Sequence, residues 1–334
     1  MSPEQRLDVQ VFPSELARIY QPIERDLEQL NRYLLSEFQA SEPFIHQLLM
    51  HIASYRGKQI RPACVFFAAR AVGECSSDAV KVAGVVELIH TATLVHDDVL
   101  DDARLRRRME TVNQRWGERV AVLLGDFIYS RGFSISTEVP GVSRLLADTT
   151  HTICEGELLQ VSSAKQLDLS EERYYEIIRK KTAVLYGMAC RVGALLGGAS
   201  EAEQQLFEDF GVHLGMAFQI ADDALDVSGD ERTAGKSLGT DLKKGKMTLP
   251  LIRLRESLHG GKLQEYRWIL EHSREMGAQQ RVAKMLLDQG ILSEVRETAA
   301  SYIESAIALL DHFPRNPHRE SMELLARFIM EREL

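Results

Sequence analysis

Apolar residues recur at intervals of three and four along most of the chain, which is the pattern of helices with one buried face. In the segment from Ser77 to Leu100 the positions at this spacing are Val82, Val85, Val86, Ile89, Ala92, Thr93, His96 and Val99. Between Glu201 and Val227 one face carries Leu206, Phe210, Leu214, Phe218 and Asp222. Both segments are therefore predicted to be long helices.

The same periodicity predicts helices at 15–39, 43–55, 62–72, 114–137, 141–164, 170–198, 250–257, 263–275, 278–288, 293–312 and 319–332. Strand signals are weak, because the chain contains no Asn-Gly or Asp-Gly dipeptide, the strongest short marker of a hairpin. We expect an all-α fold of about a dozen helices. It should form a single domain over residues 1–334, with 1–13 as a loosely held tail.

Composition narrows the class of protein. The 334 residues are 45% hydrophobic and 27% charged, as in ordinary globular proteins. The net charge of −9 argues against nucleic-acid binding. The four cysteines show no CxxC spacing, which favours free thiols in a reducing compartment. Neither a transmembrane segment nor a signal-peptide core is apparent, so a cytoplasmic location is expected.

Two aspartate clusters of the same shape lie far apart in the chain. They are Asp97, Asp98 and Asp101, and Asp222, Asp223 and Asp226. Acids at i, i+1 and i+4 place the first and last carboxylates on one helical face, where unpaired like charges cost a few tenths of a kcal/mol. If the clusters face each other, their oxygens form a cage suited to Mg²⁺ held between carboxylates and substrate phosphates.

Basic residues follow both clusters. Arg106 and Arg107 come shortly after the first, and an arginine pair suits the oxygens of a polyphosphate. Lys236 and Lys246 lie in a glycine-rich loop after the second and can close over a phosphate. The alternative for the first cluster is a solvated, charged helix end. The alternative for the lysines after the second cluster is a run of solvated charges, and this is our interpretation of Lys243 and Lys244.

Other basic residues leave two readings open. Lys58 and Arg61 lie at i, i+3, just before a proline suited to open a helix. Lys181 and Thr182 lie within an apolar helix, where a lysine either binds a ligand or extends its amine to solvent. His90 is on the same face as Asp97, and the default for such a histidine is a structural role in the core.

Together these segments resemble the trans-isoprenyl diphosphate synthase (polyprenyl synthetase) family, and in particular its long-chain, octaprenyl diphosphate synthase-like branch. The matching stretches are GKQIRP, HTATLVHDDVLDDARLRR, LLGDF, EGELLQ, KTA, FQIADDALD and GKSLGTDLKKGKMTLP. The resemblance implies a helical bundle of the isoprenoid synthase type around a central apolar cavity. It also implies a transferase that condenses isopentenyl diphosphate onto an allylic diphosphate in trans, head-to-tail additions.

The resemblance assigns a role to each matching residue. Three Mg²⁺ ions would be held by Asp97, Asp101 and Asp222, with Asp98, Asp223 and Asp226 as additional or water-mediated ligands. The allylic diphosphate would be bound by Arg106, Lys181 and Lys236, with Lys246 close by. Isopentenyl diphosphate would be held by Lys58, Arg61, His90 and Arg107. Thr182 and Gln219 would flank the reacting carbons.

The chemistry implied by the family needs no protein nucleophile. Cleavage of the allylic C–O bond gives a carbocation and a diphosphate, whose charge the cations stabilise. The double bond of isopentenyl diphosphate then attacks, and the released diphosphate removes the final proton. The sequence contains no convincing Ser–His or Cys–His pair, which agrees with this scheme.

The length of the product is expected to depend on the helix of the first cluster. A chain growing from the diphosphate passes Thr93, Ala92 and Ile89, with Ala92 about 7.5 Å below the first aspartate. An alanine there leaves room for a long product, whereas a shorter farnesyl or geranylgeranyl product is the alternative. The floor of the cavity could be any of Phe66, Phe67, Phe127, Tyr129 and Phe133.

The chain departs from the family at two places. Arg108-Met109-Glu110 stands where the family has Gly-x-Pro, and Arg56 replaces a glycine. Two rival functions are a class I terpene cyclase and a non-catalytic partner subunit of a heteromeric synthase. A second all-aspartate cluster argues against the first rival, and the presence of all six aspartates argues against the second. The resemblance further implies a homodimer.

Overall fold

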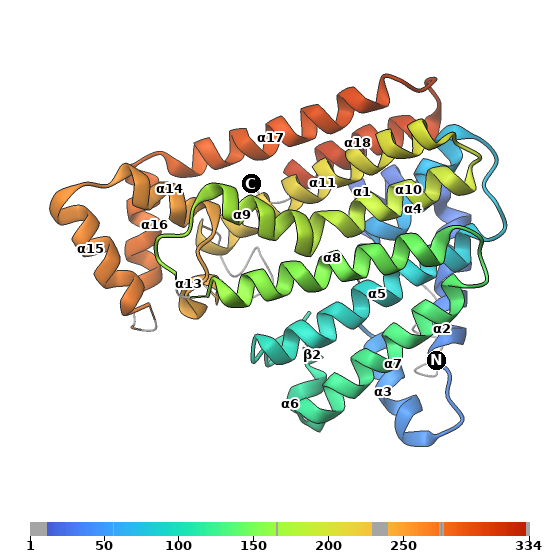
Figure 1. Ribbon diagram of the computed structural model, residues 1–334, viewed down its shortest axis with the longest axis horizontal. Helices are drawn as coiled ribbons and strands as arrows, with labels where there is room; N and C mark the ends of the chain where they lie inside the picture. The colour runs from blue at the N-terminus through green and yellow to red at the C-terminus, as the bar shows by residue number, and fades with distance from the viewer. Residues whose placement is uncertain are drawn as a thin grey trace. The chain divides into compact units, whose positions relative to one another are not determined.

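The computed structural model describes residues 12–331 except 56, 108, 165, 229–239, 274 and 276 (Figure 1). The chain forms two compact units, each described by itself. Unit 1 consists of Met1–Asp148, Met188–Glu208 and Leu310–Leu325, and unit 2 of Thr149–Gly187, Asp209–Leu309 and Ala326–Leu334. The secondary structure described is helical apart from one short hairpin, so the all-α prediction is confirmed. The expectation of a single domain stays a prediction.

Helices make up most of unit 1. Its elements are α1 (Ser14–Tyr20), η2 (Gln21–Ile23), α2 (Glu24–Glu37), α3 (Pro43–Ala53), α4 (Ile60–Val72), α5 (Ala79–Leu100), β1 (Leu105–Arg106), β2 (Met109–Glu110), α6 (Val112–Trp116) and α7 (Glu118–Ser136). Two helices predicted as continuous are interrupted. Pro22 lies in η2, and Gly117 between α6 and α7 has a φ of 90°. Proline lacks the N–H that a helix needs, and glycine tolerates the positive φ that ends one.

Helix α5 is central to unit 1. It packs against α2, α4 and α7, and it runs alongside α7 (Figure 1). Two glycines of α7 make this approach possible. A Cβ on Gly132 would lie 3.1 Å from Cδ1 of Ile89, and one on Gly125 only 2.1 Å from the His96 ring. The close packing fixes the direction of α5 and so the position of the aspartates at its end.

The apolar character of α5 also meets a membrane criterion. Among the described residues, this 22-residue helix is long and apolar enough to cross a bilayer, but 56% of its most apolar window is buried within the protein. Core helices of water-soluble proteins pass the same test of length and composition. Because α5 is covered by three neighbouring helices, we interpret it as a core helix.

Unit 2 has its own apolar core. Its elements are α9 (Glu171–Ile178), the π-helical turn η3 (Arg179–Ala183), α13 (Thr240–Lys244), α14 (Leu249–Ser257), α15 (Gly260–Glu271) and α16 (Ala278–Asp288). Residues of both units occur in α8 (Val142–Ser162), α10 (Val184–Leu196), α11 (Glu201–Ser228), α17 (Ile291–Leu310) and α18 (Pro317–Glu331). The core includes fully buried side chains such as Ile220, Leu254 and Tyr266. It supports the second aspartate cluster, which lies on α11.

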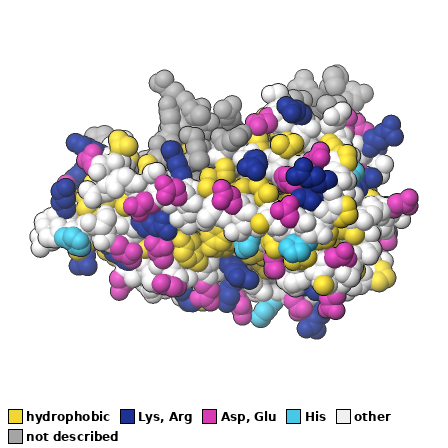
Figure 2. Space-filling model, turned by 90° about the horizontal axis from the view of Figure 1, so that it is seen from above, with side chains coloured by type: hydrophobic (Ala, Val, Ile, Leu, Met, Phe, Trp, Pro, Cys, Tyr) yellow, Lys and Arg dark blue, Asp and Glu magenta, His cyan; other side chains and the backbone are white. Residues whose placement is uncertain are grey.

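Surface charges are mixed in sign. On the face shown in Figure 2, Lys and Arg side chains lie interspersed with Asp and Glu side chains. Proteins that bind nucleic acid present a continuous basic surface instead. The net charge of −9 agrees with this ordinary, alternating surface.

Candidate functional site

The first aspartate cluster occupies the end of α5 in unit 1. Asp97 and Asp98 are in its last turn, and Asp101 is the C-cap, donating its N–H to the Asp97 carbonyl at 2.8 Å. The Asp98 side chain is buried, whereas Asp97 is half-buried and Asp101 is exposed. Burial raises the pKa of Asp98, and Arg106 opposes that rise. The cluster therefore combines one enclosed carboxylate with two that a ligand can reach.

Arg106 neutralises the enclosed carboxylate. Its Nη2 donates to Oδ1 of Asp98 at 2.7 Å, and its Nε reaches Oδ1 and Oδ2 at 2.9 and 3.0 Å. The arginine lies on the β1–β2 hairpin, in which Arg106 pairs with Met109. This forked geometry is the strongest form of an Arg–carboxylate pair. The same donors suit a phosphate, so the pair can exchange partners when an anion arrives.

Contacts to His51 of α3 and to Tyr55, which follows that helix, anchor the hairpin. The Glu110 carbonyl accepts hydrogen bonds from the Tyr55 hydroxyl at 2.7 Å and the His51 ring at 2.8 Å. Arg107, with a φ of 51°, donates from Nη1 to the Tyr55 carbonyl at 2.6 Å. Tyr55 therefore contacts both sides of the hairpin, where the sequence departs from the family's Gly-x-Pro. Arg108 and Arg56, the other departures, lie outside the described residues.

Three further predicted residues, Lys58, Arg61 and His90, lie at or near the start of α4. Arg61 donates from Nη1 to Nε2 of His90 at 3.2 Å, so the proton of a neutral ring is on Nδ1. Burial and then the charges of Arg61, Arg107 and Arg106 lower the pKa of His90 well below its ordinary value. The carbonyl of half-buried Lys58 accepts from the Tyr20 hydroxyl at 2.8 Å. The structure thus brings Arg61 and His90 together, with the charges of Arg106 and Arg107 near the ring. Their role in substrate binding stays a prediction.

Glu87 is a member of this group that the sequence analysis missed. It lies one turn before His90 on α5. Burial raises the pKa of its carboxyl, while Arg107 and Arg61 lower it. A carboxylate beside these guanidinium groups offsets their mutual repulsion. Its position three residues before His90 was the signal available in the sequence.

The three residues predicted to affect product length lie along α5. Ala92 and Ile89 are fully buried, and Thr93 donates its hydroxyl to the His90 carbonyl at 2.7 Å. The Ile89 side chain faces Gly132 of α7. Ala92 therefore lies on a face of α5 that solvent does not reach.

The second aspartate cluster lies near the end of α11 in unit 2. Asp223 is 1% exposed, Asp226 is buried and Asp222 is half-buried. Asp223 accepts from the Tyr174 hydroxyl at Oδ2 and from Nε2 of Gln219 at Oδ1, both at 2.8 Å. Burial raises the pKa of Asp223 to about 6, with Lys246 opposing.

A lysine and a further aspartate complete this region. Lys246 Nζ lies 3.5 Å from Oδ1 of Asp223 and donates to Asp241 at 3.3 Å. Despite burial, these carboxylates raise the pKa of Lys246, which keeps it charged. The backbone N–H of Asp241 donates to Asp226 at 3.1 Å. Asp241 and Tyr174 were not identified from the sequence, although Asp241 lies within the matched GKSLGTDLKKGKMTLP stretch.

A π-helical turn carries Lys181 and Thr182. Thr182 donates to Oε1 of Gln219 at 3.0 Å, which links η3 to α11. Lys181 pairs with Glu157 of α8 at 2.6 Å. Gly156 allows this approach, because a Cβ there would lie 2.5 Å from the Lys181 amide nitrogen. π-turns are frequent at functional sites, and this one determines where both predicted site residues lie.

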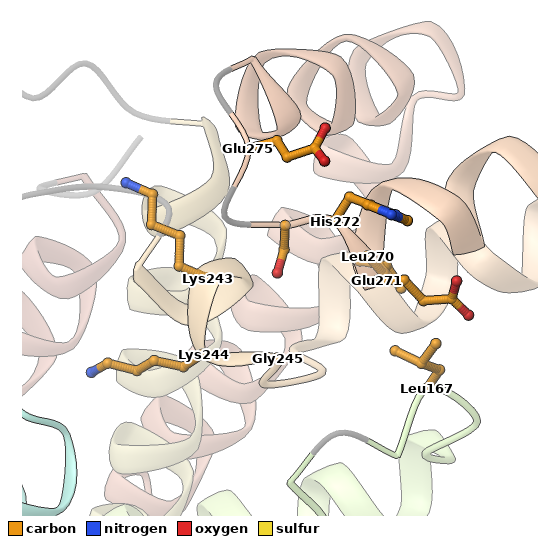
Figure 3. A pocket seen from close by; sticks show the side chains of 9 residues that line it. Leu167, Lys243, Lys244, Gly245, Leu270, Glu271, His272 and Glu275 are labelled. Atoms are coloured by element: carbon orange, nitrogen blue, oxygen red, sulfur yellow. The ribbon is translucent and has the colours of Figure 1, made fainter.

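The remaining predicted lysines are Lys236, Lys243 and Lys244. Lys236 lies outside the described residues. Lys243 and Lys244 line a surface hollow of about 680 Å³ together with residues such as Leu270 and His272. Figure 3 shows both amines extending away from the other lining residues. The interpretation of Lys243 and Lys244 as solvated stays a prediction.

Both clusters offer the donor type that a divalent cation prefers. Carboxylate oxygens are hard ligands suited to Mg²⁺. Within the part of the chain described, no three Asp, Glu, His or Cys side chains are gathered to hold an ion by themselves. This fits an ion that takes other ligands from phosphate and water. The clusters belong to different units, so the expectation that they face each other stays a prediction.

Comparisons with known proteins cover most of the chain. A family model described as polyprenyl synthetase matches residues 42–287. Octaprenyl diphosphate synthase of Escherichia coli (strain K12) is 35% identical over 323 residues, 95% of this chain and 99% of the relative. A short chain isoprenyl diphosphate synthase of Methanothermobacter thermautotrophicus is 35% identical over 289 residues, 85% and 89% of the two chains. A solved polyprenyl synthase from Caulobacter crescentus, complexed with calcium and isoprenyl diphosphate, has a TM-score of 0.91 at 35% identity, covering 96% of this chain and 98% of that one.

Proposed function

Because the chain belongs to the polyprenyl synthetase family and is thus a transferase of prenyl groups, we propose that it condenses isopentenyl diphosphate onto an allylic diphosphate with Mg²⁺. The expected isoprenoid synthase type of helical fold is confirmed by the likeness to a solved polyprenyl synthase. One observation carries the proposal. Each aspartate cluster contains a buried carboxylate paired with a cation, Asp98 with Arg106 and Asp223 with Lys246.

These pairs support a site that binds cations and phosphate together. Asp97, Asp101 and Asp222 would hold the metal, with the three other aspartates in support. The metal would supply positive charge to the leaving diphosphate. Arg106 and Lys246 then turn from their carboxylates to the phosphate oxygens. Lys181 leaves Glu157 for the same purpose, and Lys236 completes the allylic site.

The second substrate needs a separate anion site. Lys58, Arg61, His90 and Arg107 are proposed to hold the diphosphate of isopentenyl diphosphate. The neutral His90 ring presents an N–H donor on Nδ1, since Nε2 accepts from Arg61. Glu87 limits the repulsion between guanidinium groups while the site is empty of phosphate. Orientation of the two substrates in this way accounts for much of the barrier reduction in such bimolecular reactions.

Polar oxygens next to the reacting carbons complete the proposal. The Thr182 hydroxyl and the Gln219 amide lie together at the π-turn, where they would flank the carbocation. Apolar surroundings are needed to keep water from it. The released diphosphate takes the final proton, so no side-chain base is assigned.

We propose a long-chain product. Ala92 is small, and it lies on the enclosed face of α5 below the first aspartate. Sequence identity does not decide the question, because an octaprenyl synthase and a short-chain synthase are both 35% identical to this chain. A farnesyl or geranylgeranyl product remains the alternative. The small side chain at position 92 is the observation that supports the longer one.

We also propose a cytoplasmic homodimer. Leu123 and Phe127, one turn apart on α7, are 59% and 44% exposed. Large apolar side chains grouped on one helix face are typical of an interface, and a second copy buries them without any other protein. Sedimentation should show a dimer, and Phe127→Asp should shift it toward the monomer. A monomeric wild type would contradict this part of the proposal.

The decisive experiment uses the purified chain alone. It is incubated with Mg²⁺, isopentenyl diphosphate and one allylic primer at a time, and products are sized by chromatography. A ladder of prenyl diphosphates supports the proposal, and chelation of the metal should stop it. Cyclic hydrocarbon from farnesyl diphosphate alone would establish a cyclase instead. Turnover only after addition of another protein would establish a partner subunit.

A further inference from the structure

Tyr174 is a buried phenol on α9 that forms a hydrogen bond to the second aspartate cluster. Its side chain is 2% exposed, and its hydroxyl donates to Oδ2 of Asp223 at 2.8 Å. Burial and the adjacent Asp223 raise the pKa of Tyr174 well above its ordinary value. A buried hydroxyl that donates at this distance can fix the orientation of the carboxylate.

The orientation of Asp223 extends to two other residues of the candidate site. The second oxygen of Asp223 accepts from Nε2 of Gln219 at 2.8 Å. Because the amide nitrogen is held there, Oε1 of Gln219 faces the other way and accepts from the Thr182 hydroxyl at 3.0 Å. One continuous chain of hydrogen bonds thus joins Tyr174 to Thr182 through Asp223 and Gln219.

We propose that Tyr174 is a positioning residue that orients Asp223, and through it Gln219 and Thr182, for the metal-bound allylic diphosphate. The inference rests on the proposed function, since it assigns Tyr174 to the allylic half of the same reaction. Groups that orient metal ligands from outside the coordination sphere commonly matter as much as the ligands. Tyr174 contacts neither substrate nor metal and acts only through Asp223.

Loss of the hydroxyl has a defined consequence. Without it, Oδ2 of Asp223 no longer accepts a hydrogen bond from residue 174. The carboxylate can then rotate toward Lys246, whose Nζ is 3.5 Å from Oδ1. Gln219 then loses the acceptor that fixes its amide. The amide can turn over and present N–H groups where the oxygen had faced Thr182. The allylic site is affected, whereas Lys58, Arg61, His90 and Arg107 belong to unit 1 and keep their contacts.

The adjacent tyrosine provides a matched control. Tyr175 donates to Glu171 at 3.2 Å and accepts from Arg253 at 3.3 Å, and these partners are separate from the aspartate cluster. Tyr174→Phe and Tyr175→Phe each remove one hydroxyl from the same helix, α9, and leave the ring in place. Any general effect of losing a tyrosine hydroxyl on α9 should therefore appear in both variants.

The test measures binding as well as turnover. Calorimetry with Mg²⁺ and farnesyl thiodiphosphate, an unreactive analogue with sulfur as the bridging atom, reports the allylic site without catalysis. Steady-state kinetics then give KM for each substrate. For Tyr174→Phe we expect about 10-fold weaker Mg²⁺-dependent binding, a higher KM for the allylic diphosphate and an unchanged KM for isopentenyl diphosphate. Tyr175→Phe should match the wild type.

Two results would overturn the inference alone. One is binding by Tyr174→Phe within twofold of the wild type. The other is an equal rise of both KM values together with a lower melting temperature, which indicates a general structural role. If the wild type neither binds the analogue with Mg²⁺ nor turns over, the proposed function itself fails and the inference falls with it.

Discussion

Substitution of Gly57 by alanine should impair one substrate without unfolding the protein. A Cβ on Gly57 would lie 2.6 Å from Nη2 and 2.7 Å from Nη1 of Arg107. The guanidinium must therefore move by at least about 0.8 Å, the difference between 2.6 Å and the 3.4 Å at which ordinary contact begins. A shift of that size away from Tyr55 lengthens the 2.6 Å hydrogen bond from Arg107 to the Tyr55 carbonyl to about 3.4 Å and weakens it. Folding should be little affected, because the atoms displaced are the end of a flexible side chain.

The full free energy of the weakened hydrogen bond sets the upper limit of the effect. A hydrogen bond to a charged group contributes about 1.5–3 kcal/mol, which corresponds to roughly 10- to 150-fold in rate. If Arg107 holds isopentenyl diphosphate, Gly57→Ala should lower kcat/KM for that substrate by up to this factor. The KM for the allylic primer should remain close to that of the wild type. Initial rates with each substrate varied in turn measure both quantities.

Two controls make the result specific. Gly261→Ala adds a methyl group where no atom lies within 4 Å, so its kinetics should equal those of the wild type. A double-mutant cycle with Arg107→Lys tests the route, because residues that act through the same contact are not additive. Full additivity, or a wild-type KM for isopentenyl diphosphate in Gly57→Ala, would refute the reasoning.

Three further predictions follow from the two clusters and α5. Asp97→Ala or Asp222→Ala should abolish turnover while Lys243→Ala leaves it nearly unchanged; equal losses in radiolabelled product would contradict the site assignment. Ala92→Phe should shorten the product on chromatography, and an unchanged product would rule out the proposed path along α5. Because burial raises the pKa of Asp223 to about 6, kcat/KM should fall as the pH drops through 6. The sign for stability is opposite: the folded pKa lies above the unfolded one, so this group's contribution to the free energy of unfolding should grow below pH 6, and Asp223→Asn should remove that increment.

Helices were more predictable than their interruptions. The apolar residues before Leu100 predicted α5, because they recur at spacings of three and four and so lie on the buried faces of a helix. The predicted helix at 170–198 contains instead a π-turn from Arg179 to Ala183. At this turn Gly156 of α8 packs closely against the Lys181 backbone. Such a contact between segments distant in sequence leaves no mark in local periodicity.

The candidate site divides in the same way. Charged residues at short spacing, such as Asp98 and Arg106, could be identified together because the hairpin that joins them is local. Tyr174 and Asp223 are distant in sequence and meet only through the fold. The Tyr55 carbonyl that holds Arg107 is a backbone group, and backbone atoms are the same in every sequence. Tertiary contacts of this kind had to be observed.

Both aspartate clusters are placed where a helix least favours them. Asp97 and Asp98 lie in the last turn of α5, and Asp226 lies in that of α11. Main-chain carbonyls give each helix end a partial charge of about −0.5. Main chain and side chains therefore attract the same counterion, and its arrival relieves repulsion within the helix itself. The clusters therefore place negative charge where it favours ion binding rather than the stability of the helix.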